Sequence, residues 1–238
     1  MLIAGGSDLR VKLEKVLGHK RYAVRCRALR VLAENAAARE RVRLIATADD
    51  HSADVRLAFA ALMEEHRWPE AVDALVTLLA DTRNFASQLT SGSWSKFSVA
   101  RAAARALGAY EDLPDSAIDS LLEAAQAEGP DPFIACAALA ALANRDDARV
   151  MTVMGWALAS GGLNHSRSYR PRAQAAAWAL FDRATSGQSD MLTSDVVRLA
   201  ECDVPAVAAP LLMAIGVHPG ATRDKLLKRL RASGQHSR

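Results

Sequence analysis

Aromatic residues are scarce in this chain: Phe, Trp and Tyr together make up 5% of its 238 residues. Half of the chain is nevertheless apolar and 24% is charged, which is typical of a sequence that folds around a sizeable core. Alanine is abundant, so the apolar half consists mainly of small residues with high helix propensity rather than residues that favour strands. The composition therefore predicts an all-α protein.

Long apolar runs are also missing. No stretch approaches the roughly 18 to 20 uncharged residues that cross a bilayer as a helix. The first ten residues, MLIAGGSDLR, lack the basic start and the longer apolar stretch of a signal peptide. We therefore expect a soluble cytoplasmic protein that does not bind a membrane.

Residues that bind metals or cofactors are few and scattered. Cys26, Cys136 and Cys202 form no CxxC or Cys-His pair, so we expect them to be small core residues. The six histidines form no pair at metal-ligand spacing, and no phosphate-binding glycine loop or nucleophile elbow is present. The sequence predicts no metal, no cofactor and no catalytic residue.

Charge is unevenly distributed along the chain, although the net charge is only +3. Residues 1–47 have a net charge of +7, residues 48–160 have −9 and residues 161–238 have +5. Such a field can orient a partner or favour head-to-middle association. It is not the continuous positive stripe of a dedicated nucleic-acid-binding protein.

One pattern recurs along the chain: an apolar residue, often followed by Arg, then Ala about four residues on and Ala-Leu seven or eight residues on. Apolar residues at these intervals share one helical face, and the alanines let a neighbouring helix approach closely. Each instance predicts the second helix of a helical hairpin. The six anchoring positions are 24, 55, 99, 134, 172 and 207.

An amphipathic stretch before each of these helices supplies the first helix of the hairpin. Pro69, Pro114 and Pro132 mark helix starts, where a missing N–H costs nothing, and Gly108 marks an end. The hairpins are predicted to form a single domain over residues 1–238. Their ranges are 8–34, 37–66, 69–110, 114–144, 147–185 and 190–217, followed by a capping helix over 220–232.

The run Val-Arg-x-x-Ala-x-x-x-Leu at 24–32 resembles the second-helix signature of HEAT repeats. The match is good in the first four units and looser in the last two, where Pro171 and Pro205 occupy early helix positions. The resemblance covers nearly the whole chain and implies a right-handed α-solenoid of about six hairpins plus the cap. HEAT-like proteins are mostly scaffolds and adaptors, so it implies a non-catalytic role in binding another protein.

In proteins that resemble this one, second helices line the concave face, so their solvent-facing positions, two and six after each anchor, contact what the groove holds. We expect a groove for an apolar helix or extended peptide, with Trp178 as an anchor and Arg101 and Arg105 as a paired anion contact. In the alternative, the register is off by one residue and some of these side chains are interhelical core. The predicted column is Cys26, Arg30, Leu57, Ala61, Arg101, Arg105, Cys136, Ala140, Gln174, Trp178, Ala209 and Met213.

Two connections, 83–97 and 161–170, are longer than HEAT-like hairpins need. Both lie between the first and second helices of a hairpin, so we expect both on one edge of the rod, which is commonly the binding side. Each combines an aromatic residue with basic residues, which favours a partner contact over a plain linker. In the alternative, Trp94 folds back onto the helices. The candidate residues are Trp94 and Lys96 in the first connection and Arg167, Tyr169 and Arg170 in the second.

Arg25 and Arg56 directly follow the anchors of the first two units. We expect each to pair with a turn Asp of the adjacent unit rather than with a ligand.

The alternative function is that of a DNA-binding protein. The length and repeat number resemble those of alkylpurine DNA glycosylases built from HEAT-like repeats, which pair groove aromatics with a carboxylate and basic residues. Trp178 and Asp182 lie four residues apart on one helix face, with Arg172 nearby. The sequence departs from that family because this pair is not central and the middle of the chain is acidic.

Overall fold

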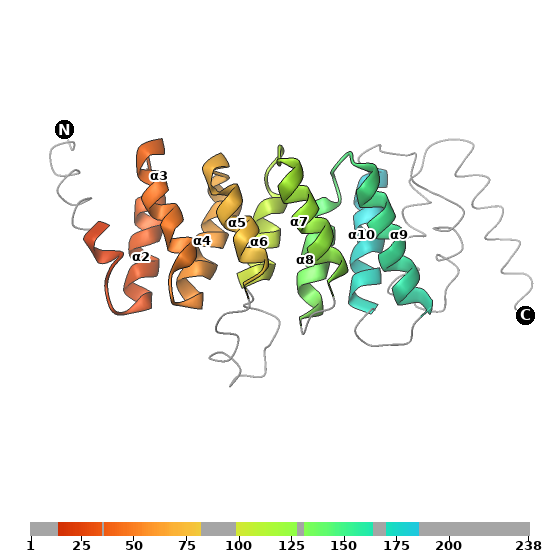
Figure 1. Ribbon diagram of the computed structural model, residues 1–238, viewed down its shortest axis with the longest axis horizontal. Helices are drawn as coiled ribbons and strands as arrows, with labels where there is room; N and C mark the ends of the chain where they lie inside the picture. Colours follow the sequence, from red (N-terminus) through yellow and green to blue (C-terminus); the bar gives the residue numbers. More distant parts are fainter. Residues whose placement is uncertain (1–13, 35, 82–98, 128–130, 164–169, 186–238) are drawn as a thin grey trace, which may run out of the picture. The chain divides into compact units, whose positions relative to one another are not determined.

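The computed structural model describes residues 14–34, 36–81, 99–127, 131–163 and 170–185 (Figure 1). The regular structure in these ranges is entirely helical, which confirms the predicted all-α class there. The chain divides into two compact units, Met1–Ser120 and Leu121–Arg238, and each is described by itself. No helix in the described ranges is long and apolar enough to span a bilayer.

Unit 1 contains the first three predicted second helices, which are α2 (Tyr22–Ala33), α4 (Ala53–His66) and α6 (Val99–Gly108). In Figure 1, α4 lies between α2 and α6, and it packs against both. Their buried side chains follow the spacing of the repeat, and alanine keeps the helices close. Those with at most 3% exposure include Ala28, Leu29, Phe59, Ala60, Ala103 and Leu107.

The first helices of unit 1 are shorter than predicted and combine with 3₁₀ turns. The prediction over 37–47 is resolved as α3 (Ala38–Ile45) followed by η1 (Ala46–Asp49), and that over 69–80 as η2 (Pro69–Ala71) followed by α5 (Val72–Leu79). Tight 3₁₀ turns are common at helix ends, where intrahelical partners run out. Helix α5 packs against α6, and α7 (Asp115–Gln126) spans the division between the two units.

Helix α4 ends without a glycine. Arg67 adopts the left-handed conformation, with φ 52° and ψ 47°, and its N–H donates to the Met63 carbonyl oxygen at 3.0 Å. The next residue, Trp68, is buried, and its carbonyl oxygen accepts a hydrogen bond from the Tyr110 hydroxyl at 2.9 Å. The predicted hairpin over 37–66 ends at the same residue as α4, but the left-handed conformation of Arg67 was not predicted, because this position usually belongs to Gly.

Unit 2 contains α8 (Pro132–Leu142), α9 (Ala148–Leu163) and α10 (Arg170–Thr185). Helix α10 packs against both α8 and α9, so the two second helices of this unit also lie side by side. Helix α8 begins as predicted at Pro132, and the carboxylate of Asp131 caps it by accepting from the Phe133 N–H at 2.9 Å. The predicted hairpin over 190–217 and the cap over 220–232 lie outside the described residues.

Candidate functional site

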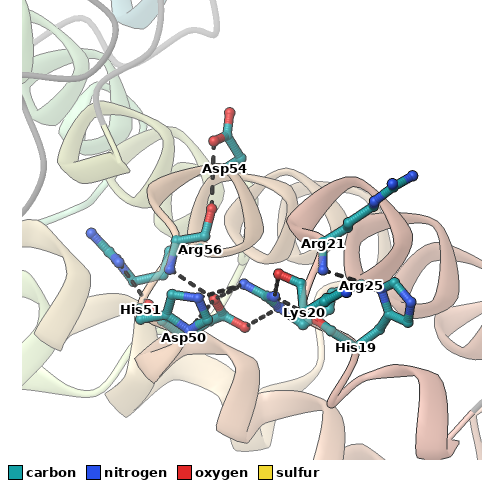
Figure 2. A network of polar contacts seen from close by, with 9 residues as sticks. His19, Lys20, Arg21, Arg25, Asp50, His51, Asp54 and Arg56 are labelled. Carbon is teal, nitrogen blue, oxygen red and sulfur yellow. Dashed lines mark hydrogen bonds and ion pairs between the residues drawn. The ribbon is translucent and has the colours of Figure 1, made fainter.

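A chain of buried arginines holds α2 and α4 in place (Figure 2). The Nε and Nη2 atoms of Arg25 donate to the Asp50 carboxylate at 2.8 and 2.7 Å, and its Nη1 donates to the His19 carbonyl oxygen at 2.7 Å. Arg56 repeats this arrangement one hairpin later, because its Nε donates to the Asp81 carboxylate at 2.5 Å and its Nη1 to the Asp50 carbonyl oxygen at 2.6 Å. The predicted pairing of these arginines with turn aspartates is therefore confirmed.

Both guanidiniums are buried, with side-chain exposures of 3% for Arg25 and 0% for Arg56. Burial is tolerated because each guanidinium is matched by a carboxylate and a carbonyl oxygen. Their polar atoms face the turns that join the first and second helices of the hairpins, and not the solvent, so these two residues position the helices rather than contact a ligand.

The pairing of Asp50 makes the stability of unit 1 pH-dependent. Burial opposes ionisation of the Asp50 carboxyl, but the hydrogen bonds from Arg25 and the Ser52 N–H outweigh it and hold the pKa below its usual 3.8. A lowered folded-state pKa contributes stability above the unfolded-state pKa of about 3.9, and this is lost as the pH falls through the folded value. We expect Asp50→Asn to cost about 2 kcal/mol at pH 7, and the cost to shrink as the pH falls below the ordinary pKa of an aspartate. Urea denaturation of the original chain and of Asp50→Asn, from pH 7 down into the acid range, measures this cost. A cost that is the same at every pH would contradict the prediction.

The predicted column of second-helix positions lies at the surface. All ten of its members within the described ranges are exposed or partly exposed, and none is buried. The register shifted by one residue, with these side chains in the core, is therefore wrong for these positions. Ala209 and Met213 lie outside the described residues.

On α6, the two column arginines differ in their surroundings. Arg105 is exposed and its Nη2 lies 2.7 Å from a carboxylate oxygen of Glu64 on α4. Arg101, one turn earlier, is partly exposed. An exposed ion pair of this kind is worth at most about 1 kcal/mol, so Arg105 can exchange Glu64 for an anionic partner at little cost.

On α10, Trp178 and Asp182 are both exposed, as expected of residues four apart on one face. Trp178 keeps 42% of its surface and packs edge-on against Phe181 at a ring-centroid distance of 5.6 Å. Arg172, by contrast, is 4% exposed, donates to the Ala127 carbonyl oxygen and lies over the ring of Trp156. These contacts of Arg172 do not support the sequence-based grouping of this residue with Trp178 and Asp182.

The cysteine prediction needs a correction. Cys26 and Cys136 are partly exposed, not core residues, because both stand two positions after an anchor and so lie on the outward side of α2 and α8. Partial burial, followed by the nearby carboxylate of Asp54, raises the pKa of the Cys26 thiol. Cys202 lies outside the described residues.

A groove runs between α2 and α4. It encloses a cavity of about 380 Å³. Its α2 wall is formed by alternating aromatic, small and basic side chains, and its α4 wall by one carboxylate and aliphatic side chains. The lining residues are Tyr22, Ala23, Cys26, Arg27, Arg30, Asp54, Ala58 and Leu62.

A second cavity of about 470 Å³ lies where η2 and α5 meet the connection from α6 to α7. Its rim is mainly acidic, with Glu70, Asp73 and Glu111 among its lining residues. Burial, followed by the charge of Glu70, raises the pKa of the Tyr110 phenol beside it to about 12. The phenol therefore stays protonated and keeps its hydrogen bond to Trp68 at physiological pH.

Four of the loop-edge residues, Trp94, Lys96, Arg167 and Tyr169, lie outside the described residues. The predicted connection over 161–170 is too long, because α9 continues to Leu163 and Arg170 is the first residue of α10. Where side chains are described, no group of three or more His, Cys, Asp or Glu could hold a metal ion.

Comparison with known proteins identifies no family for this chain. No protein-family model matches the sequence, and none of the curated proteins matches it. The HEAT-like resemblance remains a prediction based on the repeat pattern.

Proposed function

We propose that this chain is a non-catalytic, cytoplasmic protein-binding scaffold or adaptor, built as a HEAT-like right-handed α-solenoid. In this proposal, the partner contacts the outward column of the second helices. The loop-bearing edge with Trp94 and Tyr169 adds a second contact region.

The observation that supports this proposal most directly is the exposure of the whole described column. Consecutive second helices pack side by side within each unit, α2 on α4 and α4 on α6 in one and α8 on α10 in the other. Their outward positions offer an exposed Trp and exposed Arg residues, both of which are enriched among the residues that dominate binding energy at protein interfaces. The buried arginines of unit 1, in contrast, are used by the fold itself.

A pull-down from the native host followed by titration tests the proposal. The co-purifying protein should bind the double variant Arg101→Glu/Trp178→Ala at least tenfold more weakly than the original chain, because truncated anchors typically cost more than 1 kcal/mol each. Two control variants carry equivalent substitutions at positions outside the column. Phe133→Ala removes an aromatic that is 40% exposed on α8, and Arg39→Glu reverses an exposed charge on α3. Full affinity of the double variant would refute the column as the binding surface.

The alternative is a HEAT-like DNA-binding protein such as an alkylpurine DNA glycosylase. The exposed pair of Trp178 and Asp182 on α10 favours it, whereas the burial of Arg172 and the net charge of −9 over 48–160 disfavour it. A scaffold should not bind duplex DNA at physiological salt. Duplex binding with a steep salt dependence, together with base excision that is lost in Asp182→Asn, would replace the scaffold proposal with the glycosylase.

A further inference from the structure

The groove between α2 and α4 has two walls of different chemistry. We propose that it holds an acidic peptide segment of a partner protein, with carboxylates at Arg27 and Arg30 and an apolar side chain against Ala58 and Leu62. This inference rests on the proposed function, because it names the chemistry of the partner and a groove that includes the column positions Cys26 and Arg30.

The α2 wall of the groove is positively charged, because Arg27 and Arg30 line it. Three arginines of α2 and α3 have carboxylate partners: Arg25 with Asp50, Arg41 with Glu70 and Arg43 with Glu14. Arg27 and Arg30 are exposed and form no ion pair with any residue in the described ranges. Two unmatched guanidiniums one helical turn apart bind carboxylates through paired hydrogen bonds and repel a basic segment.

The groove also has an apolar part, formed by Tyr22, Ala58 and Leu62. Tyr22 keeps 50% of its surface exposed at one end of the α2 wall, while the partly exposed Ala58 and the edge of the largely buried Leu62 line the α4 wall. A half-exposed Tyr beside aliphatic side chains is a typical anchor at protein interfaces. From Tyr22 to Arg30 the helix rises about 12 Å, which an extended segment of about four residues spans.

The position of Asp54 favours a peptide over a nucleic acid. Asp54 lines the groove in the first turn of α4, close enough to Cys26 for its charge to raise the pKa of that thiol. A nucleic-acid strand places a negative charge at every nucleotide and would bring one against this carboxylate. A peptide can place its acidic residues at Arg27 and Arg30 and an uncharged or donor group at Asp54.

Cys26 provides a direct probe of occupancy because it is partly exposed and lines the groove. In the full-length chain with Cys136→Ser and Cys202→Ser, it is the only thiol. This chain would be panned against a display library of random twelve-residue peptides. The enriched peptides would then be synthesised and titrated by fluorescence anisotropy.

The enriched peptides should contain at least two acidic residues and one apolar residue. They should slow maleimide labelling of Cys26 at least fivefold. Arg30→Glu should weaken their binding at least tenfold, whereas Arg39→Glu, an equal charge reversal on α3, should change it less than threefold. Tyr22→Ser should also weaken binding, which provides a second variant that leaves the charge unchanged.

Several results would overturn the inference: no enriched peptide, enriched peptides without acidic residues, unchanged labelling of Cys26, or equal binding to Arg30→Glu. Stronger protection of Cys26 by a twelve-nucleotide single-stranded DNA than by the peptides would also overturn it. A pulled-down partner that is lost with Arg101→Glu/Trp178→Ala but unaffected by Arg30→Glu would reject this groove and leave the scaffold proposal standing.

Discussion

Arg56→Ala is expected to lower the free energy of unfolding of unit 1 by about 3 to 5 kcal/mol. Both side chains of the Arg56–Asp81 pair are buried, at 0% and 1% exposure, so removal of the guanidinium leaves the Asp81 carboxylate uncompensated in the core. It also leaves the Asp50 carbonyl oxygen without its donor. Urea denaturation, with hydrogen exchange of α4 as the local readout, measures the loss.

An exposed pair in the same unit is the matched control. Arg105→Ala removes an equivalent guanidinium from its Glu64 partner, where the side chains are 59% and 36% exposed, and should cost at most about 1 kcal/mol. The double variant Arg56→Met/Asp81→Leu replaces the buried pair by apolar side chains and should recover most of the loss. If Arg56→Ala cost no more than Arg105→Ala, the buried arginine chain would not hold the hairpins together.

The sequence predicted this pairing because Arg25 and Arg56 recur at the same place in successive repeats. It did not predict that Asp50 joins the two pairs, with its carboxylate on Arg25 and its carbonyl oxygen on Arg56. A backbone acceptor leaves no trace in the residue pattern. The arrangement does not continue into α6, because the equivalent position holds the buried Ala100.

The surface column was also predictable, since helical periodicity alone places positions two and six after an anchor on the side opposite the core. The cysteine prediction failed because it used the average burial of free Cys and ignored that same periodicity for Cys26 and Cys136. The groove between α2 and α4 was not predicted. It depends on which side chains of two neighbouring helices face each other, and spacing along one helix does not determine this.

Arg172 shows a further limit of the sequence pattern. It occupies an anchor position that Val fills in three earlier units. It is nevertheless buried, because its long side chain reaches the Ala127 carbonyl oxygen and the ring of Trp156. A flexible basic residue can satisfy its charge far from its own backbone. Its grouping with Trp178 and Asp182 assumed that it stays at the surface.

Unit 2 uses a different buried arginine, and Arg183→Met is expected to destabilise this unit by about 3 kcal/mol. The Nη1 atom of Arg183 donates to the carbonyl oxygens of Ala143 and Arg145 at 2.8 and 2.5 Å, just beyond the end of α8. These hydrogen bonds satisfy acceptors that a helix end leaves open, and the positive charge suits the negative end of the helix dipole. Burial lowers the pKa of Arg183, and the charge of Asp146 partly offsets this.

Loss of two charge-assisted hydrogen bonds, at about 1.5 kcal/mol each, gives the expected size of the effect. Because the methionine fills the buried volume, a loss of stability of this size would result from the missing hydrogen bonds to the two carbonyl oxygens and not from a cavity. Hydrogen exchange should rise in the last turn of α8 and in α10, while exchange in α4 stays as it was, because Arg183 contacts unit 2. Arg149→Ala, which removes the exposed Arg149–Asp147 pair, should leave exchange at the end of α8 nearly unchanged. An Arg183→Met protein with undisturbed exchange in α8 would show that solvent replaces the guanidinium at no cost.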